Sequence, residues 1–373
     1  MDATLADGVV RAGTDARERF YDSQGYGHPV DGGELELAPV EAAHLLYRGD
    51  MDAVDGQSFR TVLTSAAVSE TAFLVYKDLR DRGFYLSPAR EAWTADGADA
   101  GGGGGGGDGD AGIDFVVYPR GSGPWDGEVA YRVRVVGERE PVAAAALGET
   151  VLAVVDEESE ITYLETARPD VEGSTAVDLP ESVPAELLAE RAFVWDPPAH
   201  LYESGFFGQQ LDDGEVLQLS LVETAYLARR GALAVTGGAE AAVERGRKAG
   251  SEARSASERT SGPEGPRVEG ERFDRRLRAY TELREHGIVP KTGFKFGADF
   301  RTYTDVDSVE SLGHSELLVR VLDAERALAP RDLALDVRLA HGVRKEMVFA
   351  LVDDGSGANA AGVEWVSVGR LTP

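Results

Sequence analysis

In the second half of the chain, one run of apolar positions recurs every three or four residues, the period of an amphipathic helix. Phe273, Leu277 and Tyr280 fall on one face of that helix. Gly287 follows directly and is typical of the residue that ends a helix. The pattern therefore predicts a helix over residues 274–286.

Shorter apolar runs follow this helix and predict strands around one further helix. The turn-forming sequence TDVDS separates the first two runs, and a proline precedes the second helix. In chain order, the pattern predicts two strands, a helix and two buried strands at 294–302, 314–322, 331–341, 345–353 and 363–370. This order favours a mixed β-sheet with helices packed on it.

The same pattern occurs twice along the chain. LELAPVEAAHLLYRGDMDAV at 35–54 resembles LQLSLVETAYLARRGALAV at 217–235, and YKDLRDRGFYLSP at 76–88 resembles YTELREHGIVPKT at 280–292. Shorter matches follow in the same order: DFVVYPRG with DFRTYTDV, YRVRVV with LVRVL, and LAVVDEE with FALVDDG. A period of about half the chain indicates a duplicated domain pair, because solenoid repeats are much shorter.

Polar stretches divide the two copies. We expect a first repeat at 1–170 with a glycine-rich linker at 93–112, a linker at 171–190, and a second repeat at 191–373 with a loose insertion at 238–270. The predicted fold class is α+β, built by tandem duplication. In each repeat, a small α/β N-terminal subdomain precedes a mixed-sheet α/β core.

Charge is the most unusual feature of the composition. Asp and Glu total 66 against 38 Lys and Arg, so the net charge is −28, and the acids are spread over the whole chain. This composition is typical of a protein from a salt-rich cytoplasm, where charge repulsion is screened, so net charge says little about the partner. We expect a cytoplasmic protein without a membrane partner, because the apolar runs are short and the start MDATLADGVV does not resemble a signal peptide.

Candidate chemistry comes from comparing the two copies. Tyr303, His314 and Lys345 in the second copy align with a tyrosine, a glutamate and a glycine in the first. Histidine can donate a proton near neutral pH, lysine can stabilise charge developing on a phosphate, and tyrosine can orient or deprotonate a hydroxyl. This set suits RNA strand cleavage by a 2′-hydroxyl. It needs no cofactor, and we expect no metal, since no two of the six histidines have ligand spacing and cysteine is absent.

Each of the three residues also has a structural interpretation. Tyr303 would pack at a strand end, His314 would occupy a turn, and Lys345 would be a solvated lysine. The segment near Tyr303 favours RNA, because residues 271–301 hold eight Lys and Arg against five acids, as a phosphate backbone would require. By contrast, Asp114 and Asp299 occupy matching positions, which favours a structural role for both.

The order of several motifs is specific where each motif alone is not. The second half carries YTELREHG at 280–287, GFKFGADFRTY at 293–303, GHSELLV at 313–319, RLAHGVRK at 338–345 and a terminal WVSVGR. In this order they resemble the archaeal tRNA-splicing intron endonucleases, in particular the subfamily with two repeats per chain that works as a homodimer.

The resemblance implies roles for the three residues. Tyr303 would be the general base, His314 the general acid and Lys345 the transition-state stabiliser. The substrate would be precursor tRNA, cut at both ends of an intron folded as a bulge-helix-bulge, with 2′,3′-cyclic phosphate and 5′-hydroxyl ends. The first repeat would be a pseudo-catalytic copy.

The resemblance also implies contacts with RNA and with a second chain. Arg338 would contact a bulge base in the opposite active site, Arg370 would be its companion, and Trp365 is the alternative companion. In the first repeat, an acidic loop would contact the partner chain of the homodimer through Asp156, Glu157, Glu158 and Glu160. Two alternatives stay open: a non-catalytic RNA-binding or scaffold subunit, and a metal-dependent nuclease.

Overall fold

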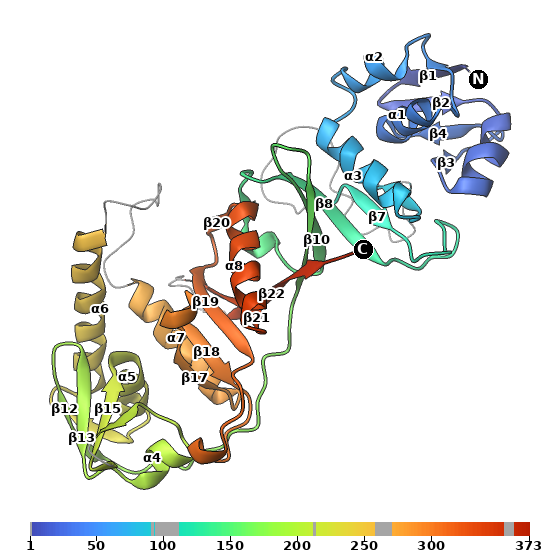
Figure 1. Cartoon of the computed structure of the whole chain (residues 1–373). Coiled ribbons are helices and arrows are strands. Elements are labelled where there is room, and N and C mark those ends of the chain that lie inside the picture. Colours follow the sequence, from blue (N-terminus) through green and yellow to red (C-terminus); the bar gives the residue numbers. More distant parts are fainter. Residues whose placement is uncertain (1, 91–92, 94–111, 212–213, 258–270, 354–361) are drawn as a thin grey trace. The chain divides into compact units, whose positions relative to one another are not determined.

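The computed structural model describes residues 2–90, 93, 112–211, 214–257, 271–353 and 362–373, and Figure 1 shows its elements. The glycine run at 101–107 and residues 258–270 of the expected insertion lie outside the described residues. The chain divides into two compact units. The first unit contains residues 1–167, 327–335 and 369–373, and the second contains residues 168–326 and 336–368.

Each unit begins with a small five-stranded sheet, and the two sheets have the same topology. The first is ordered β3-β4-β2-β1-β5 and the second β14-β15-β13-β12-β16. In the first unit the elements are β1 (Asp2–Ala6), β2 (Val9–Ala12), η1 (Arg17–Asp22), β3 (His28–Pro29), β4 (Leu35–Leu37), α1 (Pro39–Arg48), β5 (Ala53–Val54) and α2 (Phe59–Leu63). In the second they are β12 (Val183–Leu187), β13 (Arg191–Trp195), α4 (Ala199–Glu203), β14 (Gln209–Leu211), β15 (Val216–Ser220), α5 (Leu221–Arg229), β16 (Leu233–Val235) and α6 (Gly238–Ser257).

The mixed-sheet cores also repeat. Strand order is β6-β7-β8-β10-β11 in the first and β17-β18-β19-β21-β22 in the second, with parallel pairs β8–β10 and β19–β21. The first core consists of α3 (Glu70–Asp81), β6 (Leu86–Pro88), β7 (Phe115–Val117), β8 (Tyr131–Gly137), η2 (Ala144–Ala146), β10 (Thr150–Val155) and β11 (Ile161–Ala167). A ribbon of β9 (Val142–Ala143) and β20 (Ala327–Leu328) belongs to the same unit.

The second core carries the candidate residues. It consists of α7 (Glu271–Glu285), β17 (Val289–Thr292), η4 (Phe294–Phe296), β18 (Phe300–Tyr303), η5 (Val309–Ser311), β19 (Leu317–Asp323), α8 (Pro330–Gly342), β21 (Glu346–Val352) and β22 (Glu364–Leu371). Helix α7 lies against the sheet (Figure 1). Its residues Leu277 and Tyr280, on the apolar face that the sequence predicts, share a buried cluster with the sheet residues Phe300 and Val319. Equal topology in both units confirms an α+β fold made by tandem duplication.

A pair of carboxylates shows how closely the copies agree. Asp299 precedes β18, and its Oδ2 accepts the backbone N–H of Val321 at 3.0 Å. Asp114 precedes β7 and accepts the backbone N–H of Val135 at 2.7 Å. Each carboxylate thus bonds the start of its own strand to the strand that follows, β19 for Asp299 and β8 for Asp114. The structural interpretation of this pair is confirmed.

Two expected elements differ from the structure. The strand expected over 294–302 begins only at Phe300, because residues 294–296 form a 3₁₀ turn between two glycines. Gly297 has a φ of 71°, and a Cβ on Gly293 would lie 2.8 Å from the Ala298 carbonyl oxygen, so this tight turn depends on both glycines.

The expected loose insertion is the second difference. Residues 238–257 form α6, because Ala242 and Val243 are fully buried and Gly246 leaves room for the Phe273 ring of α7. Small residues hide this face from a search for large apolar side chains. Strand β12 also falls inside the 171–190 stretch expected as a linker. Among the described helices, none has the length and apolar character that crossing a membrane requires.

Candidate active site

Tyr303 ends β18 and is the most deeply placed of the three candidate residues. Its side chain is 5% exposed, and its ring packs edge-on against Phe206 with the centroids 5.6 Å apart. Val289 and Val306 complete this small apolar cluster. Within the described part of the chain, the Tyr303 hydroxyl has no hydrogen-bond partner.

His314 lies on the segment that connects η5 to β19, where its side chain is exposed. This segment is bonded to the end of β18 by Glu316, whose N–H donates to the Thr302 carbonyl at 3.0 Å. The Glu316 carboxylate also accepts the Thr304 N–H at 3.0 Å. The segment carrying His314 is thus fixed to the two residues that flank Tyr303.

Lys345 approaches the same segment from the other side. Its ammonium donates to the carbonyl of Ser315, the residue after His314, and lies 5.8 Å from the centroid of the Phe296 ring. Arg344 has a left-handed φ of 56°, which turns the chain from α8 into β21. The structure therefore brings the three residues to one end of neighbouring strands, and hydrogen bonds through residues 315 and 316 connect them.

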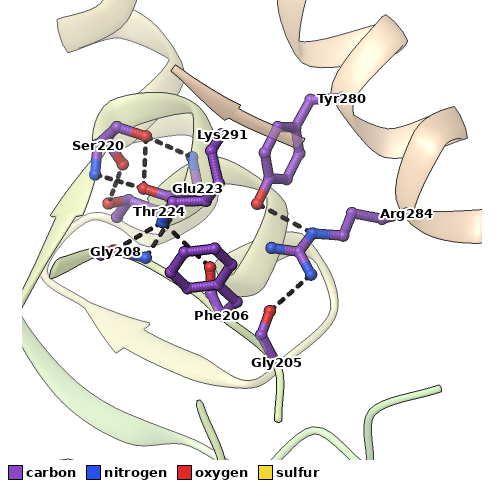
Figure 2. A network of polar contacts seen from close by, with 9 residues as sticks. All are labelled: Gly205, Phe206, Gly208, Ser220, Glu223, Thr224, Tyr280, Arg284 and Lys291. Atoms are coloured by element: carbon purple, nitrogen blue, oxygen red, sulfur yellow. Dashed lines mark hydrogen bonds and ion pairs between the residues drawn. The ribbon is translucent and has the colours of Figure 1, made fainter. Parts of the chain in front are cut away.

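A buried polar network holds the segment that covers Tyr303 (Figure 2). The ammonium of Lys291 donates to the carbonyls of Phe206 at 3.1 Å and Gly208 at 2.6 Å, and pairs with the Glu223 carboxylate at 3.5 Å. Arg284 donates to the Gly205 carbonyl at 2.8 Å. Lys291 and Arg284 together fix residues 205–208 and hence the Phe206 ring that packs on Tyr303.

Electrostatics in this network follow from burial and pairing. Burial lowers the pKa of Lys291, although the Glu223 carboxylate opposes that effect. Burial alone would raise the pKa of Glu223, but Lys291 and the N–H groups of Gly208 and Ser220 outweigh it, so the pKa of Glu223 is lowered. Each pKa in this pair is thus set by burial and by the charge of the partner together.

The first copy contains the same network without the lysine. Ser87 occupies the position of Lys291, and the Tyr118 hydroxyl donates to it at 3.1 Å. Arg80 still donates to the Gly25 carbonyl, as Arg284 does to Gly205 in the second copy. The signal for Lys291 in the sequence is this difference between the copies, a lysine in one and a serine in the other.

The basic strip over 271–301 is partly neutralised by carboxylates of the same chain. Arg272 and Arg276 both pair with Asp299, at 2.8 and 3.1 Å. Arg275 is buried and pairs with Asp323 at 3.4 Å. The positive charge expected to face RNA is thus smaller than the count of residues suggests. Four cations of this strip have no partner carboxylate in the described residues. Arg278 and Arg284 donate to backbone carbonyls instead, and the other two are Lys295 and Arg301.

The candidate RNA-contacting residues are placed differently from one another. Arg338 on α8 and Arg370 on β22 are exposed. Trp365 is 8% exposed within the core, and its indole N–H donates to the Glu282 carboxylate at 3.4 Å. No base could stack on this ring as placed, so Trp365 is corrected from a candidate RNA contact to a core residue.

A parallel in the first copy explains the position of Trp365. Tyr163 on β11 donates its hydroxyl to the Asp78 carboxylate at 2.7 Å, just as Trp365 on β22 donates to Glu282. Asp78 and Glu282 occupy matching positions on α3 and α7. Both copies therefore use an aromatic N–H or O–H to fasten the last strand to this helix. Among the described residues, no group of three or more His, Asp or Glu side chains could hold a metal ion.

Comparison with known proteins identifies the family. The model for the catalytic C-terminal domain of tRNA intron endonucleases matches residues 273–359, and the model for their N-terminal domain matches twice, at 1–63 and 183–245. These matches cover more than half of the chain, and the twofold N-terminal match agrees with the duplicated topology. The chain belongs to the tRNA intron endonuclease family, and it is an enzyme, an endonuclease.

Similar chains occur in halophilic archaea. The chain is 60% identical over 373 residues to a tRNA-splicing endonuclease of Haloarcula marismortui. It is 58% and 54% identical to tRNA-splicing endonucleases of Natronomonas pharaonis and Haloferax volcanii. Each alignment covers all of both chains. The acidic composition fits proteins of such organisms.

Proposed function

We propose that this endonuclease excises introns from precursor tRNA at bulge-helix-bulge sites. The reaction would proceed by attack of a 2′-hydroxyl on the adjacent phosphate, leaving 2′,3′-cyclic phosphate and 5′-hydroxyl ends. The observation that carries the proposal is the connection of Tyr303, His314 and Lys345 through residues 315 and 316.

Each of the three side chains has a place in this reaction. Tyr303 would accept or orient the proton of the attacking 2′-hydroxyl, because its own hydroxyl is free of internal hydrogen bonds in the described residues. His314, which is exposed, would donate a proton to the leaving 5′-oxygen. Lys345 would stabilise the negative charge that develops on the phosphate.

Cleavage of a defined substrate tests the proposal. The purified chain is incubated in molar KCl and EDTA with a precursor tRNA whose intron ends are bulged. We expect two cuts, with ends that carry a 2′,3′-cyclic phosphate and a 5′-hydroxyl. The control is the same RNA with both bulges closed by base pairing, which should stay intact. Bound but uncut bulged RNA would favour a scaffold subunit, and cutting that EDTA abolishes would favour a metal-dependent nuclease.

We also infer that two chains pair through the acidic loop between β10 and β11. Asp156 shapes this loop, because its carboxylate accepts the N–H groups of Glu158 and Glu160, each at 2.9 Å. Glu157 pairs with Arg139 of the same chain at 2.8 Å. Glu158 and Glu160 are exposed and suited to a basic surface on a partner.

Substitution of the outward carboxylates tests the dimer. The double variant Glu158→Gln, Glu160→Gln keeps Asp156 and hence the loop, and should shift the mass in solution from dimer towards monomer. Glu157→Gln, whose carboxylate is paired within the chain, is the matched control and should stay dimeric. A double variant with the mass of the parent would remove this loop from the interface.

Arg338 is the residue we propose to contact a bulge base, since its guanidinium is exposed on α8. Arg370 on β22 is proposed as its companion. Arg338→Ala should weaken cleavage of the bulged substrate. Equal cleavage rates for parent and variant at substrate concentrations below saturation would contradict this role.

A further inference from the structure

Arg301 lies on β18 two residues before Tyr303, so both side chains project from the same face of the strand. Its guanidinium carbon is 5.7 Å from the centroid of the Tyr303 ring. The side chain is partly exposed. Arg301 is therefore beside the proposed general base.

Arg301 has no acceptor among the described residues. Its Nε is buried without a hydrogen-bond partner, and no described carboxylate pairs with it. Arg272 and Arg320 of the same unit differ, because they pair with Asp299 at 2.8 Å and Asp336 at 2.7 Å. Arg278 and Arg284, which have no carboxylate partner either, donate to backbone carbonyls instead. The donors of Arg301 are therefore available to an external anion.

The neighbour of Arg301 makes the lack of an acceptor more significant. Its register partner across the β17–β18 ladder is Lys291, another cation. Like charges directly opposite each other destabilise an antiparallel pair. Lys291 is offset by Glu223, whereas Arg301 is not. Ion pairing within the described residues therefore gives no reason for a cation at position 301.

The first copy shows that the sheet forms without these charges. There the same register pairs Ser87 with Val116, and neither carries a charge. Strand order and helix packing are nevertheless the same in both units. The arginine thus accompanies the copy that holds Tyr303, His314 and Lys345, and the first copy forms the same sheet with a valine in its place.

We propose that Arg301 binds an RNA phosphate next to the bond that is cleaved, and so positions the strand against Tyr303. A guanidinium presents several N–H donors in one plane and suits two phosphate oxygens at once. This inference rests on the proposed function, since it places the phosphate at the site of Tyr303, His314 and Lys345. Lys291 would not touch RNA, because it is enclosed by Phe206, Gly208 and Glu223.

The test measures binding and cleavage of bulged precursor tRNA by Arg301→Gln and Arg301→Lys. We expect Arg301→Gln to raise the half-saturating RNA concentration about tenfold, as loss of a charge-assisted contact would. The slope of log affinity against log salt should become shallower by about 0.7, the value for one phosphate contact in single-stranded RNA. Arg301→Lys should restore the slope and part of the affinity.

Controls separate binding from folding and from the proposed function. Arg229→Gln removes an exposed arginine that pairs with Glu240 at 3.3 Å and should leave both measurements unchanged. Arg301→Val introduces the residue found at the matching position of the first copy, Val116. This variant replaces Arg301→Gln in both measurements if the glutamine variant does not fold. Parent-like affinity and salt slope in a folded Arg301 variant would overturn this inference alone. Failure of the parent to cleave would overturn the proposed function, while the binding slope would still decide the role of Arg301.

Discussion

Glu41 in the first copy and Glu223 in the second perform the same structural task, but their pKa values are shifted in opposite directions. Each carboxylate accepts two backbone N–H groups: those of Gly27 and Ala38 for Glu41, and those of Gly208 and Ser220 for Glu223. Burial raises the pKa of Glu41 to about 7, whereas the pKa of Glu223 is lowered.

The main cause of the difference is one residue on a neighbouring strand, and the Ser220 hydroxyl, which also donates to Glu223 and which Ala38 of the first copy lacks, adds to it. Lys291 pairs with Glu223, while Ser87 in the matching place offers Glu41 no charge. The comparison teaches that a duplicated fold can keep its hydrogen bonds and topology while one copy gains internal cations. In the second copy those cations gather around Tyr303, at Lys291 and Arg301.

The largest expected effect is on the cleavage rate, and it should be seen for a change in the second copy but not for the matching change in the first. His314→Ala should slow cleavage of precursor tRNA by roughly 10²- to 10⁴-fold, the range for loss of a general acid, while folding is retained. The matched control is Glu128→Ala, which changes the corresponding exposed residue of the first copy and should leave the single-turnover rate unchanged. Equal rates in the two variants would remove His314 from the mechanism.

The next largest effect comes from a substitution that removes the internal cation of the second copy, as in the first copy. Lys291→Met leaves Glu223 buried without its cation and should lower the unfolding free energy of the second unit by about 3–5 kcal/mol near pH 8. Hydrogen exchange of the α5 amides measures this locally. In the parent, the lowered pKa of Glu223 gives stability that is present above its unfolded value and lost as pH falls. The variant would raise that pKa, so its deficit should shrink towards pH 5; a deficit independent of pH would contradict the pairing.

A control for Lys291→Met lies on the adjacent turn. Lys295 is exposed, so Lys295→Met removes an equal charge without exposing a buried carboxylate. The exchange of the α5 amides should then match that of the parent.

A smaller effect is expected in the first copy. Because the folded pKa of Glu41 is raised from 4.5 to about 7, its contribution to stability is complete below about pH 4.5 and is lost as pH rises through 7. The loss amounts to about 3 kcal/mol. Glu41→Gln should remove this pH dependence from the opening free energy of the α1 amides. The parent dependence persisting in the variant would show that another group titrates.

The smallest effect concerns the tyrosine of the first copy. Tyr118→Phe removes the hydrogen bond to Ser87 and should destabilise the first unit by about 1 kcal/mol, measured by thermal unfolding. Cleavage should be unaffected, whereas Tyr303→Phe, the same change in the second copy, should impair it. A cleavage defect in Tyr118→Phe would mean that the first copy takes part in the reaction.

The sequence predicted the parts of the molecule that follow from the spacing of apolar residues and from comparison of the two copies. The apolar face of α7, the strands β19, β21 and β22, and the duplicated order all follow from patterns of large side chains. The three candidate residues emerged because the first copy lacks two of them. Their roles remain predictions, although the structure places them near one another.

The parts that could not be predicted depend on contacts rather than periods. Helix α6 packs through alanine, valine and glycine, which carry little apolar signal, and Trp365 is buried because Glu282 receives its indole N–H. The basic strip was a misleading signal because the count of basic residues left out the carboxylates that pair with them. Asp299 alone pairs with two of the eight cations. Lys291 is also turned inward, which no local pattern reveals.

The hydrogen bond from Lys345 to the Ser315 carbonyl makes the position of His314 depend on Lys345, so two residues of the proposed mechanism are coupled. The carbonyl belongs to the residue that follows His314, so truncating the lysine would also release the loop that aims the imidazole. Rate losses from Lys345→Ala and His314→Ala would then fail to multiply in the double variant, and the double variant would be little slower than the worse single one.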